Sequence, residues 1–212
     1  MNTKGLVLAT VAAVAVCLNV SAIPIFPGGF EIYPGPEPAP IGAAVVAQIT
    51  MPFAGADIQG EVISTVLTGD LLNPFGGLTF TYEINVDQAA GHPLGSFSVG
   101  NYGPYLTDMS WSPDLNPLGV APTYMDRSLL GEVLHYDFSM LGGPGIWGGE
   151  SSALMVVRTD ALFYQPTIAS VINSGSAEVN SFAPIAVPEP ASAGLIALVS
   201  GGALFIRRRF MI

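Results

Sequence analysis

Cysteine is almost absent from this sequence, because Cys17 is the only one among 212 residues. A single thiol excludes a disulfide framework and the paired-cysteine spacings of structural zinc sites. Cys17 lies within an apolar N-terminal run, so the chain that follows has no thiol for nucleophilic or redox chemistry. A body of roughly 140 residues must therefore be stabilised by its apolar core alone.

Basic residues are also scarce and unevenly placed. Lys4 lies near the N-terminus, three arginines lie at the C-terminus, and only Arg127 and Arg158 lie between them. Residues 23–187 contain fifteen acidic side chains. Such a surface repels phosphate backbones, so we expect no nucleic-acid partner; it favours solubility and contact with divalent cations.

Residues 1–22 predict a signal peptide. Lys4 supplies the positive start, and residues 5–18 form an uncharged apolar run of 14 residues, which is short for a spanning helix. Small residues follow, so cleavage is expected after Ala22. A retained membrane anchor is one alternative. A lipoprotein acylated at Cys17 is another, although Val16 stands where a lipoprotein box has a small residue.

The C-terminus has three consecutive features. Val187, Pro188, Glu189 and Pro190 are followed by sixteen uncharged residues, 191–206, and then by a basic stop of Arg207, Arg208 and Arg209. Sixteen helical residues span about 24 Å, slightly less than a hydrocarbon core, and snorkelling arginines close the gap. Three arginines favour the cytoplasmic side, so we expect a single transmembrane helix with the body outside the cytoplasmic membrane.

This tail resembles the PEP-CTERM sorting signal of exopolysaccharide-producing Gram-negative bacteria. The resemblance covers about the last 25 residues and includes all three parts in order, with Pro188, Glu189 and Pro190 at the motif positions. It implies recognition by an exosortase, a membrane cysteine peptidase, which cleaves near the motif and releases or transfers the body. A plain C-terminal anchor after a proline linker is the alternative.

The body shows β periodicity throughout. Residues 78–86 alternate apolar and polar side chains, which predicts a strand with one buried and one wet face. Residues 134–140 and 45–53 follow the same pattern. Residues 58–67 and 153–164 are apolar on both faces, as central strands are, and two closing strands are predicted over residues 168–172 and 177–182.

These strands predict one all-β domain, a β-sandwich of jelly-roll-like type, over residues 41–184. Residues 23–40 contain six prolines and three glycines, which predicts a semi-extended linker before it. The segments 100–124 and 142–149 are expected to be the most irregular loops. The second half of the body loosely resembles a recurrent domain of PEP-CTERM substrates, through Asp126-Arg127-Ser128, Gly149-Glu150-Ser151-Ser152 and Phe182-Ala183-Pro184.

The sequence has no motif of a hydrolase elbow, a phosphate loop or a dinucleotide fold, so no catalytic residue, cofactor or metal is assigned. His135 and Asp137 are spaced to share one strand face, and a solvated face is the favoured interpretation. Trp147 lies in a glycine-rich segment and Trp111 in a predicted loop. Each could stack on a sugar ring, or could instead pack against the end of the domain.

Three functions follow from this sequence. The first is an exported cell-surface or extracellular-matrix protein with a non-catalytic structural or interaction role. Its expected partners are the secretion machinery, an exosortase-like peptidase, the cytoplasmic membrane before processing and exopolysaccharide. The second is a carbohydrate-binding module that uses Trp111 or Trp147. The third is a glycosidase, which needs two convergent carboxylates in a cleft.

Overall fold

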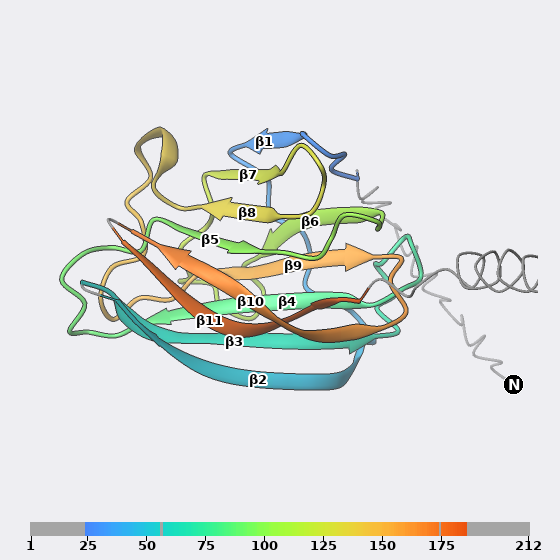
Figure 1. Ribbon diagram of the computed structural model, residues 1–212, viewed down its shortest axis with the longest axis horizontal. Helices are drawn as coiled ribbons and strands as arrows, with labels where there is room; N and C mark the ends of the chain where they lie inside the picture. The colour runs from blue at the N-terminus through green and yellow to red at the C-terminus, as the bar shows by residue number, and fades with distance from the viewer. Residues whose placement is uncertain (1–23, 56, 174, 186–212) are drawn as a thin grey trace, which may run out of the picture.

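The computed structural model describes residues 24–55, 57–173 and 175–185 (Figure 1). Several expectations therefore lie outside the described residues: cleavage at Ala22, the motif at Val187, Pro188, Glu189 and Pro190, the apolar run 191–206, and Arg207, Arg208 and Arg209. Over the part of the chain that is described, the structure has no helix that combines the length and the hydropathy needed to span a bilayer.

The fold is all-β, with two antiparallel sheets. The first sheet has six strands in the order β1 (Phe30–Ile32), β7 (Tyr124–Arg127), β8 (Leu134–Asp137), β5 (Ser96–Val99), β10 (Tyr164–Ile172) and β11 (Ser176–Pro184). The second sheet has five strands in the order β2 (Ala44–Ala54), β3 (Gln59–Thr68), β4 (Thr79–Val86), β9 (Leu154–Thr159) and β6 (Thr107–Ser112). A short 3-10 turn, η1, covers Met140–Gly142.

The apolar inner faces of the two sheets meet in one core. The rings of Tyr82 on β4 and Phe97 on β5 lie 5.2 Å apart, and both side chains are fully buried. Burial removes a phenol from water, so its hydroxyl needs a partner. Tyr82 Oη donates to the carbonyl oxygen of Phe182 on β11 at 2.7 Å, which ties the two sheets together.

Most predicted strands are observed with shifted ends, but two end early: the strand predicted over residues 153–164 ends at Thr159 as β9, and the one predicted over residues 134–140 ends at Asp137 as β8. Two details of the strand faces also differ from expectation. The strand β4 is buried on nearly both faces, because Thr79 and Thr81 are covered rather than wet. Thr79 Oγ1 donates to Asp70 Oδ2 at 3.1 Å under the loop that joins β3 to β4. In β2 a bulge lies between Val45 and Ala47, and it places Val45 on the outer face instead of with the apolar set.

Two segments that composition predicted to be irregular belong to the folded body. Residues 24–40 were expected as a linker, yet they contribute β1, and the backbone N–H of Ile25 donates to the carbonyl of Thr107 at 3.0 Å. Residues 100–124 were expected as a loop, yet they contain the whole of β6. Proline lacks an N–H donor but keeps its carbonyl acceptor, so a proline-rich segment still packs where side-chain donors meet it.

Candidate binding groove on the five-stranded sheet

The outer face of the five-stranded sheet is partly covered by a strap, which we define as residues 33–43. The strap begins beside the first sheet, where the Tyr33 N–H donates to the Thr123 carbonyl at 2.8 Å. It then passes over the edge strand β6, where the Glu37 N–H donates to the Trp111 carbonyl at 2.8 Å. The strap thus forms one wall over the outer face of the second sheet.

Arg158 on β9 holds the strap from below. Its side chain is 1% exposed, and its guanidinium lies 2.7 Å from Glu37 Oε2 and 3.2 Å from Asp70 Oδ2. A third N–H donates to the carbonyl of Pro38 at 3.0 Å. A planar guanidinium suits such a site because its five donors are arranged in a fixed fork.

A third carboxylate in this cluster, that of Asp108, lies near Arg158 without a hydrogen bond to its Oδ2 atom from any described residue. Asp108 Oδ2 lies 3.7 Å from Arg158 Nη1, which is too long for a hydrogen bond, and among the described residues it accepts none. Burial raises the pKa of Asp108 to about 7, and the nearby charge of Glu37 adds to this shift, while Arg158 opposes it. One cation is therefore shared among three carboxyl groups, and Asp108 is the one held partly neutral near pH 7.

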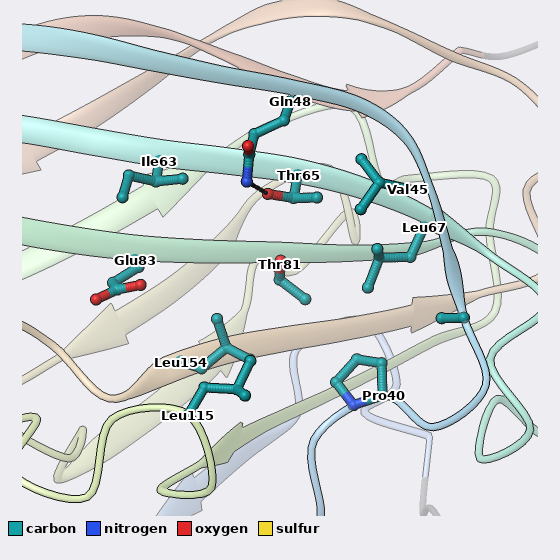
Figure 2. Close-up of a pocket in the computed structure, with 11 residues that line it drawn as sticks. Pro40, Val45, Gln48, Ile63, Thr65, Leu67, Thr81, Glu83, Leu115 and Leu154 are labelled. Carbon is teal, nitrogen blue, oxygen red and sulfur yellow. Dashed lines mark hydrogen bonds between the residues drawn. The ribbon is translucent and has the colours of Figure 1, made fainter.

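Beside this cluster the outer face of the sheet is hollowed into a groove of about 290 Å³ (Figure 2). The groove extends over β2, β3, β4 and β9, with the strap on one side and the loop after β6 at its lower edge. Its lining residues are Pro40, Ala43, Val45, Gln48, Ile63, Thr65, Leu67, Thr81, Glu83, Leu115 and Leu154. The bulge in β2 matters here, because it turns Val45 toward this face.

The groove combines an aliphatic floor with a row of polar groups. Figure 2 shows Gln48, Thr65 and Thr81 on adjacent strands, with Gln48 Nε2 donating to Thr65 Oγ1 at 3.0 Å. Glu83 adds a carboxyl group, whose pKa is raised above 4.5 by partial burial and then by the charge of Glu61. Convergent amide, hydroxyl and carboxyl groups over apolar surface are typical of small-ligand sites.

The two tryptophans lie apart from this groove and from each other. Trp111 is half-buried on β6, and its Nε1–H donates to the Pro34 carbonyl at 2.8 Å. Its role here is to fasten the strap. Trp147 is 49% exposed in the loop before β9, where its backbone N–H donates to Glu150 Oε2 at 2.9 Å. Of the two predicted stacking residues, the structure leaves Trp147 open to solvent.

His135 pairs with a different carboxylate from the one its sequence spacing indicates. Its Nδ1 lies 2.8 Å from Asp126 Oδ1, since β7 and β8 place these two residues opposite each other. Asp137 instead accepts hydrogen bonds from the backbone N–H groups of Ser139 and Met140, which closes the turn after β8. Over residues 24–55, 57–173 and 175–185, no group of three or more potential metal-ligating side chains comes together.

Comparison with protein-family models, with curated proteins and with solved structures found no significant match to this chain.

The groove was not predictable from the sequence, because the residues that line the groove come from four strands and two connecting segments. One local signal was present: residues 43–47 are five consecutive apolar residues, which break the period of two. Such a break is typical of a bulge that turns one side chain to the opposite face. The pairing of Gln48 with Thr65 depends on the register between β2 and β3, which the sequence does not specify.

Proposed function

We propose that this chain is an exported cell-surface or extracellular-matrix protein, sorted through a PEP-CTERM-like tail, whose β-sandwich has a non-catalytic interaction role. Support for export and sorting comes from the sequence of the two ends, residues 1–22 and 187–212. An exosortase-like peptidase would act near Pro188, Glu189 and Pro190, after the tail had anchored the chain in the cytoplasmic membrane.

The observation that supports an interaction role is the groove on the five-stranded sheet. Its walls are fixed by the Arg158 cluster and by the strap, so it is formed without a ligand. A preformed groove binds with little loss of conformational entropy. This favours a partner that is extended and narrow enough to lie across β2, β3 and β4.

An uncharged polysaccharide is the partner that this groove fits best, which makes a carbohydrate-binding module the second candidate. Gln48, Thr65 and Thr81 offer donors and acceptors to sugar hydroxyl groups, while Ile63 and Leu154 offer apolar contact to the C–H faces of a ring. Glu83 and its neighbour Glu61 would repel an anionic polymer. The proposed ligand of the groove is therefore a neutral chain of the surrounding exopolysaccharide.

The test is binding of the purified protein to neutral and acidic exopolysaccharide fractions, compared with the variant Gln48→Ala. Loss of one or two hydrogen bonds predicts roughly five- to tenfold weaker binding. Thr50→Ala is the matched control, because Thr50 is exposed on the same face of β2 but does not line the groove.

Equal affinity of Gln48→Ala and the wild type would contradict the assignment of the groove. Release of sugar ends, abolished in Glu83→Gln, would overturn the non-catalytic role and favour a glycosidase.

A further inference from the structure

One end of the sandwich exposes apolar side chains on several loops and carries few exposed charges. It is formed by the segments 69–78, 100–106, 128–133 and 160–163, which lie together on the right of Figure 1. The pairings place them there, since Leu67 lies opposite Thr79, and Thr79 and Asp108 both lie opposite Arg158. We call this surface the apolar end.

Seven large apolar side chains project from these loops into solvent. Their exposed fractions are 79% for Leu71, 51% for Leu106, 83% for Leu129, 79% for Leu130, 39% for Val133, 71% for Leu162 and 56% for Phe163. Loop tips in soluble proteins are usually polar, so exposed leucines on four separate loops of one end indicate a contact surface. The loops support one another, as the Leu106 N–H donates to Asp160 Oδ1 at 3.0 Å.

Exposed charge is sparse at this end. Across the loops that define it, the exposed carboxylates are Glu132 and Asp160. The opposite end also exposes apolar side chains, Trp147 among them, but it surrounds them with the exposed acids Asp57, Asp87, Asp114 and Glu150. Of the two ends of the sandwich, the apolar end therefore carries the fewer exposed carboxylates.

The described chain also leaves the domain at the apolar end. The backbone N–H of Ile185, the last described residue, donates to the Phe163 carbonyl at 3.3 Å, and the Tyr105 hydroxyl donates to the Ile185 carbonyl. Five residues, 186–190, separate Ile185 from the apolar run that begins at Ala191. Ile185 and Ala191 are thus six Cα–Cα steps apart, which even fully extended span no more than about 22 Å.

From this juxtaposition we propose that the apolar end is a lipid-contacting surface, which rests on the outer leaflet of the cytoplasmic membrane while the tail is still attached. The inference depends on the proposed anchoring of residues 191–206. The interfacial layer of a bilayer is about 5–8 Å thick, and the short tether holds the leucines beside it at a high effective concentration. The partner is a zwitterionic bilayer surface, because an anionic one would repel the acidic body.

In this orientation the groove and Trp147 would face in different directions relative to the membrane. The β2–β3–β4 face would stand upright along the membrane normal, and the acidic end with Trp147 would point away from the membrane. Lipid contact would thus hold the tail and its cleavage region at a fixed height during processing, and removal of the tail would free the body.

The test uses residues 23–212, which contain no cysteine, in single-copy zwitterionic nanodiscs, with one added cysteine that carries an environment-sensitive dye. Labels at Leu162→Cys and Leu130→Cys should show blue-shifted emission and several-fold stronger quenching by brominated lipid than a label at Leu141→Cys. Leu141 is the matched control, because it is 51% exposed and lies at the opposite end.

Three results would overturn the proposal, and they are distinguishable. If the chain fails to incorporate into nanodiscs, the tail does not anchor it, and both the proposed sorting and the lipid contact are wrong. If the chain incorporates but all three labels stay equally aqueous, only the lipid contact is wrong. Shielding that is absent from single-copy discs and appears only in discs loaded with two copies would likewise overturn it, in favour of a contact between copies.

Discussion

Replacing Asp108 by asparagine should make the protein more stable above pH 7. Asp108 is buried beside Arg158, yet its Oδ2 lies 3.7 Å from Arg158 Nη1 and accepts no hydrogen bond among the described residues. Burial and the charge of Glu37 raise the pKa of this carboxyl group from 3.8 to about 7. Asparagine keeps the size of the side chain and cannot ionise.

The sign of the effect follows from proton binding. Between pH 4 and 7 the folded protein holds a proton on Asp108 that the unfolded chain has released, so the free energy of unfolding decreases as the pH rises. The contribution of Asp108 to the free energy of unfolding is fully present below pH 4 and is lost as the pH rises through about 7. At about 1.4 kcal/mol per pH unit, the total loss amounts to at most about 4 kcal/mol.

The assay is urea unfolding, followed by tryptophan fluorescence, at a series of pH values from 5 to 8.5. The difference in unfolding free energy between Asp108→Asn and the wild type should grow with pH up to about 7 and then level off. Asp87→Asn is the control, since Asp87 is exposed in the loop after β4. A difference that is constant with pH, or that shrinks as the pH rises, would refute the account of the Arg158 cluster.

Two further substitutions test how the sandwich is held together. Arg158→Met should lower the free energy of unfolding by about 3–5 kcal/mol, because it leaves the buried carboxyl group of Asp70 without its cation. Urea unfolding at pH 8 measures this loss. A loss below about 1 kcal/mol would contradict the prediction. Tyr82→Phe should cost about 1–3 kcal/mol, because the Phe182 carbonyl and the Tyr102 hydroxyl both lose their partner; thermal unfolding measures it, with an unchanged melting temperature as the contrary result.

The strands were predictable where their side chains alternate and where turns separate them. The alternation over residues 78–86 and 134–140 corresponds to β4 and β8, which supports the all-β assignment. Short strands that pair far along the chain were not predictable in the same way. Three-residue β1 pairs with β7 nearly a hundred residues later, and four residues carry too little periodicity to identify β5. The jelly-roll-like connectivity stays a prediction.

The composition of a segment does not show how that segment packs in the folded domain. The proline-rich segment 23–40 has the content of a linker, but it cannot show that Arg158 and Trp111 supply donors to the carbonyls of Pro38 and Pro34. Arg158 forms ion pairs with Glu37 and Asp70, which lie 121 and 88 residues away in the sequence. Arg127 donates instead to backbone carbonyls, those of Ile25 and Tyr102 among them. Such partners depend on topology.

Intact mass of the mature protein is the most direct test of the central claim that the chain is exported and sorted. The protein would be purified from the cell-surface and medium fractions of its native host, and from a mutant that lacks the tail-processing peptidase. The account predicts a wild-type mass that begins after Ala22 and ends near Val187, with the tail retained in the mutant. A tail that stays intact in both strains would contradict sorting and leave an acidic β-sandwich anchored in the cytoplasmic membrane.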